Sequence, residues 1–172
     1  MALDPNRIEN MNRNAESLRS MLDSRSLKYT VEEQTDARTH IRIRFAGADI
    51  PMTLHIILRT DKQIASVFSV MPFRISEEHL SDAAVAVAAA NHGLIDGSFD
   101  LNLSSGEIRF RLTSCFLGSI LSEQLYSYLM FVSAETVDRY NDRFLALNSG
   151  EMTLAQFLDA DAADGQTDEP KG

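Results

Sequence analysis

The feature that most constrains this chain is the stretch 76–147, where helical and strand patterns follow one another without a break. The patterns predict an alanine-rich helix over 77–91, a hairpin over 97–112, and a long amphipathic helix from Ser119 or Ser122 to Leu147. Gly106 supplies the turn of the hairpin, and Asn148-Ser-Gly150 is typical of a helix end. The stretch therefore predicts a topology, and it contains no recognisable reaction centre.

The first half of the chain changes its hydrophobic period once. Asp4 followed by Pro5 is a helix start, and the apolar residues from Ile8 to Leu22 recur every three or four positions, which predicts one buried helical face. Asn14 is expected on another face of this helix. From Lys28 to Met71 the period becomes two, which predicts four strands in an antiparallel meander.

Together these segments predict an α+β fold, in which helices pack on an antiparallel sheet of about six strands. The expected order is helix, four strands, helix, two strands, helix. A length of 172 residues suits one domain, expected over 1–150. A capping-box pattern at Thr153 predicts a short C-terminal helix over 151–158. The acidic residues 159–172 are expected to be a disordered tail.

Composition excludes several classes of function. The net charge is -9 with a sequence pI of about 4.8, which argues against a nucleic-acid partner. The start of the chain lacks the pattern of a signal peptide, and no apolar run approaches the roughly 18 residues of a membrane span, so a cytoplasmic protein without a membrane partner is expected. Cys115 is the only cysteine, which excludes an internal disulfide; it is expected to be buried.

Motifs for catalysis and for cofactors are missing from the sequence. There is no Gly-x-Ser-x-Gly elbow, no Gly-x-Gly-x-x-Gly and no P-loop, and the four histidines show no zinc-binding spacing. His40 and His55 lie on strands that could be neighbours, which leaves a two-histidine site with an acidic third ligand open. We expect a protein that is not an enzyme, with no cofactor and no metal.

Four arginines form the one candidate binding site. Arg42 and Arg44 share one strand face, and Arg109 and Arg111 share another, opposite the apolar residues that should contact the helices. Cross-strand ion pairs with Glu32, Glu107 or Asp100 would explain them structurally. The alternative is a surface that binds an acidic protein segment or a second subunit. The strand 64–71 is apolar on both faces in places, which favours a homodimer.

Most of the chain resembles a known family. The alanine-rich helix that leads into Asn91, Gly97-Ser-Phe-Asp-Leu, Gly106-Glu-Ile-Arg-Phe-Arg and Leu121-Ser-Glu-Gln-Leu are similar to segments of the YbjN family of bacterial sensory transduction regulators. The resemblance implies a fold like that of type III secretion chaperones. It also implies a non-enzymatic protein, and it brings no catalytic residues and no cofactor.

Three functions remain open from the sequence. The first is a cytoplasmic regulator or chaperone-like domain that binds a protein or peptide as a homodimer, by strand addition or in an apolar groove. The second is a type III secretion chaperone that keeps an effector segment unfolded. The third is a small-molecule sensor with a pocket between helix and sheet, for which Tyr126, Tyr128 and Tyr140 would be the polar aromatic lining.

Overall fold

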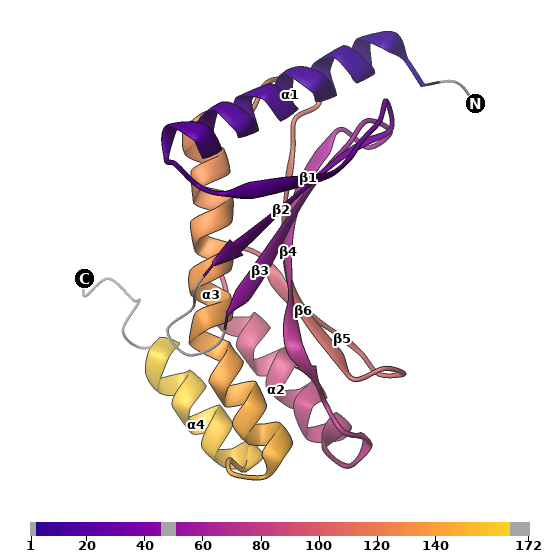
Figure 1. Cartoon of the computed structure of the whole chain (residues 1–172). Coiled ribbons are helices and arrows are strands. Elements are labelled where there is room, and N and C mark those ends of the chain that lie inside the picture. Colours follow the sequence, from indigo (N-terminus) through magenta and orange to yellow (C-terminus); the bar gives the residue numbers. More distant parts are fainter. Residues whose placement is uncertain (1–2, 46–50, 166–172) are drawn as a thin grey trace.

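The computed structural model describes residues 3–45 and 51–165 (Figure 1). The elements follow in the order α1 (Pro5–Ser24), β1 (Tyr29–Gln34), β2 (Arg38–Phe45), β3 (Met52–Arg59), β4 (Ile64–Arg74), a 3₁₀ turn (Glu77–His79), α2 (Leu80–Gly93), β5 (Ser98–Asn102), β6 (Glu107–Cys115), α3 (Glu123–Ser149) and α4 (Leu154–Gly165). The predicted order from the first helix to α3 is confirmed, and α4 overlaps the short C-terminal helix expected over 151–158.

All six strands form one antiparallel sheet in the order β1-β2-β3-β4-β6-β5. The first four strands are the predicted meander. The hairpin of β5 and β6 joins this meander through β6, which pairs with β4 and leaves β5 at the far edge. The α+β class and the six-stranded antiparallel sheet are therefore confirmed.

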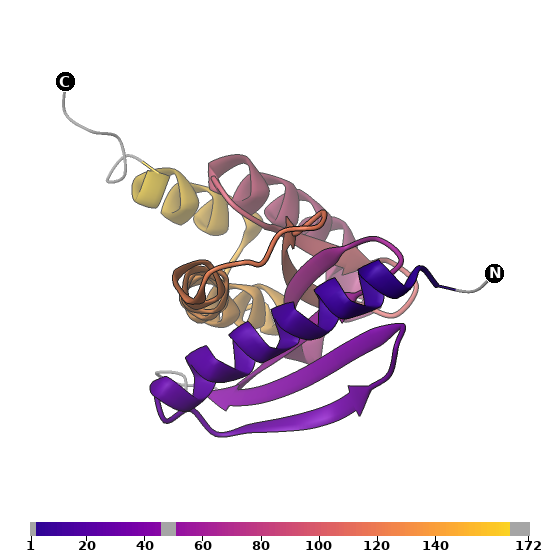
Figure 2. The same cartoon turned by 90° about the horizontal axis from the view of Figure 1, so that it is seen from above.

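The helices gather on one side of the sheet, as Figures 1 and 2 show together. Helix α1 packs on β2 and β3, α3 packs on β3, β4 and β6, and α2 packs on β5. Each strand from β2 to β4 buries every second residue, so one face supplies the core and the other is left to solvent. This asymmetry defines where a binding surface can lie.

The last helix differs from the sequence prediction. Helix α4 continues to Gly165, so the expected boundary between a helix ending at 158 and a disordered tail is wrong for 159–165. Two contacts explain the longer helix: Phe157 is fully buried among Tyr140 and Phe144, and the Tyr140 hydroxyl donates to Asp161 Oδ1 at 2.5 Å. The rest of the predicted tail, 166–172, lies outside the described residues.

Asn14 also departs from its predicted position, because it is fully buried. Its Nδ2 donates to the carbonyl oxygens of Asn10 and Ser119, both at 2.9 Å. Its Oδ1 accepts from the Leu121 amide at 2.9 Å and from the Tyr126 hydroxyl at 3.2 Å. Every polar atom of this amide is satisfied, so Asn14 fastens α1 to the segment that precedes α3.

Two turns show where a glycine is required and where it is not. Gly106 has φ +68°, and a Cβ there would lie 2.1 Å from the Ile75 carbonyl oxygen, so the hairpin turn depends on it. Gly93 is the last residue of α2 and does not have a positive φ, and the C-cap Leu94 has φ -85°. In the same hairpin as Gly106, β5 ends at Asn102, and Leu103 is 63% exposed in the turn.

Candidate functional site: the open face of the sheet

The side of the sheet that faces away from the helices is the candidate binding surface, and we call it the open face. Strand alternation and register define its members. They are Arg38, His40, Arg42, Arg44, Thr53, His55, Ile57, Arg59, Ile64, Ser66, Phe68, Val70, Ser98, Asp100, Asn102, Glu107, Arg109, Arg111, Thr113 and Cys115. The face combines apolar, aromatic and basic side chains in a protein whose net charge is -9.

All four predicted arginines lie on the open face. One continuous cross-strand row runs Thr30, Arg42, His55, Phe68, Arg111, Ser98, so arginines from β2 and β6 flank the same two aromatic rings. Arg44 lies opposite Thr53, and Arg109 lies between Val70 and Asp100. The sequence thus placed these residues on one surface, although it could not tell how far apart the two pairs are.

Three of these arginines also make the cross-strand ion pairs that the sequence left open. Arg42 Nε lies 2.5 Å from Glu32 Oε1, while Arg109 and Arg111 share Asp100 at 3.1 and 3.0 Å. Hydrogen bonds from Arg111 and then Arg109 hold the pKa of the Asp100 carboxyl below its usual range, and the bond from Arg42 does the same for Glu32. These half-exposed pairs orient the guanidinium groups more than they stabilise the fold.

The centre of the open face is apolar. Ile57, Ile64, Phe68 and Val70 project from β3 and β4, the two strands in the middle of the sheet. The ring of His55 stacks on Phe68 with centroids 4.9 Å apart and an interplanar angle of 13°. An apolar centre with an arginine rim is the usual composition of a protein-binding surface.

His40 and His55 do meet, as their strands suggested. His40 Nε2 lies 2.9 Å from His55 Nδ1, so one imidazole donates a hydrogen bond to the other. Among the residues that the structure describes, no group of three or more His, Cys, Asp or Glu side chains is placed to hold a metal ion. The pair is therefore a hydrogen-bonded element of the open face rather than a completed metal site.

This histidine pair predicts a pH-dependent stability. Burial lowers the pKa of both imidazoles, with Arg38 adding to the effect at His40 and His40 adding to it at His55. Because the folded-state pKa lies below the unfolded value of about 6.5, the unfolded state binds more protons in that range. The contribution of the two histidines to the free energy of unfolding is therefore fully present above the unfolded pKa, and it is lost as the pH falls through the folded pKa. We expect the urea concentration at the midpoint of unfolding to decrease as the pH is lowered from 7.5 to 5. The decrease should be smaller in the double variant His40→Gln/His55→Gln. An equal fall in the double variant would contradict this origin.

Sequence reasoning missed three basic residues at the β3–β4 end of the open face. Arg38 and Arg59 are direct cross-strand partners, and Lys62 lies in the turn that follows. The pentapeptide from Arg59 to Gln63 reads simply as a polar connection, so only the register between β2 and β3 reveals that these cations are neighbours. With Arg109 and Arg111 they surround a cavity of about 460 Å³.

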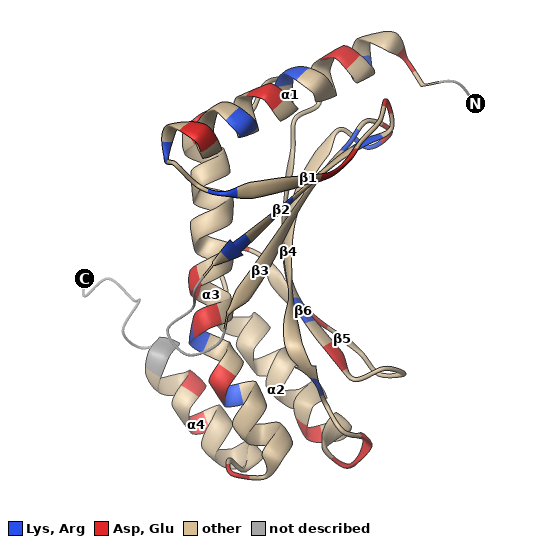
Figure 3. Ribbon diagram, in the orientation of Figure 1, with Lys and Arg blue, Asp and Glu red and all other residues tan. Residues whose placement is uncertain are grey.

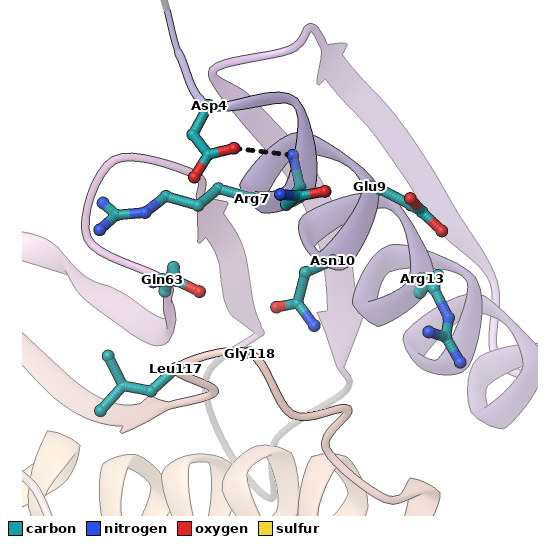
Figure 4. Close-up of a pocket in the computed structure, with 9 residues that line it drawn as sticks. Asp4, Arg7, Glu9, Asn10, Arg13, Gln63, Leu117 and Gly118 are labelled. Carbon is teal, nitrogen blue, oxygen red and sulfur yellow. Dashed lines mark hydrogen bonds between the residues drawn. The ribbon is translucent and has the colours of Figure 1, made fainter.

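A second cavity, of about 410 Å³, lies between the first turns of α1, the β3–β4 turn and the segment after β6 (Figure 4). Asp4 caps the helix by accepting from the Asn6 amide at 2.9 Å, and Arg7 Nη1 donates to the Asp61 carbonyl oxygen at 3.1 Å. The two acidic residues of its lining, Asp4 and Glu9, offset its two arginines. The cavity therefore selects no charge, and its contacts serve to hold α1 to the sheet.

The three tyrosines proposed as a sensor pocket do not converge. Tyr126 and Tyr140 are 14 helical positions apart, which is about 21 Å along α3. Tyr126 is buried and donates to Asn14, Tyr140 is buried and donates to Asp161, and Tyr128 is half-exposed and donates to Asp96. Their hydroxyls serve tertiary contacts, so they line no shared binding pocket.

Cys115 is exposed rather than buried. It is the last residue of β6 and lies opposite Ile64, so strand alternation turns its side chain to the open face.

Among the residues that the structure describes, no helix is both long and apolar enough to cross a bilayer.

Comparison with known proteins agrees with this architecture. The family model described as "Putative bacterial sensory transduction regulator", YbjN, matches residues 14–146. The crystal structure of YbjN from E. coli, described as "a putative transcription regulator", is similar with a TM-score of 0.53 and 10% sequence identity, over 87% of this chain and 93% of that one. No curated protein matches the chain. Since the family model covers most of the sequence, the chain belongs to the YbjN family of bacterial regulators.

Proposed function

We propose that this chain is a non-enzymatic regulatory domain of the bacterial cytoplasm that acts by binding an acidic protein segment on its open face. The observation that supports this most is the apolar centre of the sheet, where the half-buried Ile57, Phe68 and Val70 lie on the face without helices, between arginines of β2 and β6. An acidic partner is favoured because its carboxylates would meet guanidinium groups already oriented by Glu32 and Asp100.

The distribution of charge supports the same partner. Figure 3 shows acidic residues on α4, and that helix contains no Lys or Arg over Leu154–Gly165. The open face instead holds Arg38, Arg42, Arg44, Arg59, Arg109 and Arg111. Helices α1 and α3 carry arginines as well, so the difference in charge lies between the open face and α4. It would steer an acidic segment toward the sheet rather than toward α4.

The homodimer remains a prediction. The apolar strand that suggested it is β4, and its position between β3 and β6 accounts for part of that character, because Ala65, Val67 and Met71 face the helices. On its other face, Phe68 and Val70 are half-buried, and a partner subunit could cover the rest of them. Light scattering at high micromolar concentration is expected to give the mass of two subunits; the mass of one would remove the dimer from the proposal.

A capture experiment with matched variants tests the binding surface. Tagged wild-type protein is used to capture partners from a lysate of its own bacterium, beside Phe68→Ser on the open face and Phe131→Ser on α3, where Phe131 is 44% exposed. Loss of the central aromatic side chain in Phe68→Ser should reduce the recovered amount of a specific partner about tenfold or more.

The control variant should retain that partner, and the segment of the partner that contacts the sheet should be acidic. Equal recovery with Phe68→Ser, or an equal loss with Phe131→Ser, would contradict the proposed surface. A partner recovered only in unfolded form would support chaperone-like binding of an effector segment on the same face.

A further inference from the structure

We propose that the basic cavity at the β3–β4 end of the open face binds a phosphoryl dianion, carried by a small phosphorylated molecule or present as free phosphate. This goes beyond the binding of a protein segment and does not depend on it. The cavity has a volume of about 460 Å³ and nine lining residues: Arg38, Ile57, Arg59, Lys62, Ile64, Ser66, Arg109, Arg111 and Thr113. Five of these carry a positive charge and none carries a negative one.

The register shows that this concentration of charge is costly without a ligand. Arg38 and Arg59 are direct cross-strand partners, and like charges in such positions repel one another. Three carboxylates outside the lining reduce the repulsion: Glu33 pairs with Arg38, Asp61 with Arg59, and Asp100 with both Arg109 and Arg111. Five cations against three anions leave an excess of two positive charges, which matches one phosphoryl group of about -2 at neutral pH.

Unused donors remain on these cations. Arg109 gives only its Nε–H to Asp100, and Arg59 gives its Nε and Nη2 to Asp61, out of five N–H groups on each guanidinium. Ser66 Oγ and Thr113 Oγ1, which also line the cavity, lie 2.9 Å apart and share a hydrogen bond, which leaves one hydroxyl hydrogen to donate to an oxyanion. Guanidinium and hydroxyl donors of this kind are the usual ligands of phosphate oxygens.

The cavity is also held in shape before any ligand arrives. The buried Thr60 fastens the β3–β4 turn to the β1–β2 turn, because its hydroxyl donates to the Asp36 carbonyl at 2.6 Å and its amide to the Ala37 carbonyl at 3.1 Å. Arg38 begins β2, Arg59 ends β3 and Lys62 lies in the β3–β4 turn, so all three adjoin turns that are tied together. Ile57 and Ile64 add apolar lining against which the body of a phosphate monoester can pack, and the volume lies within the range of about 300 to 1,000 Å³ typical of small-molecule sites.

The sequence contains no phosphate-binding motif that would predict this cavity. Glycine-rich loops bind phosphate through backbone amides at a helix start. Here the donors are side chains of β2, β3, β4 and β6 with one turn residue, and only the order and register of the strands bring them together.

Isothermal titration with inorganic phosphate and with phenyl phosphate, at constant ionic strength in a phosphate-free buffer, tests the site on the purified full chain. Wild-type protein should bind one equivalent saturably. Arg59→Gln/Lys62→Gln should bind about tenfold or more weakly, since charge-assisted contacts of this kind are lost. The control Arg13→Gln/Lys28→Gln removes the same charge at residues that do not line this cavity and should stay within about twofold of wild type.

Phenyl phosphate binding more tightly than phosphate would identify a monoester as the ligand, and equal affinity would identify free phosphate; either result supports the site. Absence of saturable binding to wild type would overturn it, as would an equal loss in the control, which would reveal only general charge attraction. Far-UV circular dichroism and melting establish that both double variants fold, and Lys62→Gln alone, at an exposed turn residue, replaces the first if it does not.

Discussion

Truncation of Phe144 to alanine is expected to lower the free energy of unfolding by about 4 kcal/mol, in the range for deletion of a buried phenyl ring. Phe144 is fully buried, and its ring lies 5.2 to 6.0 Å from those of Phe99, Tyr140 and Phe157. These rings come from β5, α3 and α4, so the cavity would loosen three elements at once. Urea denaturation followed by circular dichroism measures the change.

The neighbouring residue provides the control for this prediction. Leu145 is on the same helix but 38% exposed, so Leu145→Ala should cost much less, within about 1 kcal/mol. Similar losses of stability in the two variants would mean that the aromatic cluster is not the packing centre between β5, α3 and α4.

Replacement of Asn14 by alanine is expected to lower the free energy of unfolding by about 3 kcal/mol, because the loss leaves two buried partners without the hydrogen bond that Asn14 supplies. These partners are the Leu121 amide and the Tyr126 hydroxyl, whereas the Ser119 carbonyl keeps its bond from Asn10 Nδ2 at 3.0 Å. In the folded protein they join α1 to the start of α3. Chemical denaturation of Asn14→Ala measures the loss, and Tyr126→Phe, which removes one bond only, should cost about 1 kcal/mol.

Asn12 offers a matched comparison, since it is an asparagine two positions earlier on the same helix and is only half-buried. Asn12→Ala should change stability by no more than about 0.5 kcal/mol. If Asn14→Ala were equally mild, water would have to replace the amide, and the buried network would not determine how α1 docks.

Asn14 also illustrates what the sequence could and could not predict. Period-three and period-two patterns predicted α1, the meander and the hairpin because burial of one face is a local property of a segment. A buried amide breaks that rule, since it is polar in sequence and apolar in position. Its burial becomes intelligible only when the segment 119–121 supplies partners more than 100 residues away.

The candidate site was predictable to a similar degree. Alternation was enough to assign Arg42, Arg44, Arg109 and Arg111 to the face without helices. The basic cavity was not predictable, because Arg38 faces Arg59 only through the register of β2 and β3, and Arg111 reaches the same cavity only because β6 pairs with β4. Pairings between distant strands follow from the packing of the whole sheet, and no local pattern specifies them.

The prediction of where the last helix ends was wrong for a related reason. Residues 159–165 are acidic and small, a composition typical of disorder. In the structure Phe157 anchors the helix in the aromatic cluster, and the Tyr140 hydroxyl gives Asp161 a partner. A tertiary anchor of this kind extends a helix beyond what its own composition would support.

The most direct test of the binding surface uses the only cysteine of the chain, which is exposed on the open face. A photo-crosslinker attached to Cys115 should join the protein covalently to its partner in the native lysate, through an acidic segment identified by mass spectrometry. The control carries the same group on Cys115→Ser/Ser149→Cys, at an exposed residue of α3. A specific adduct is expected from Cys115 alone. The same adduct in equal yield from position 149, or none from Cys115, would contradict the assignment of the open face as the binding surface.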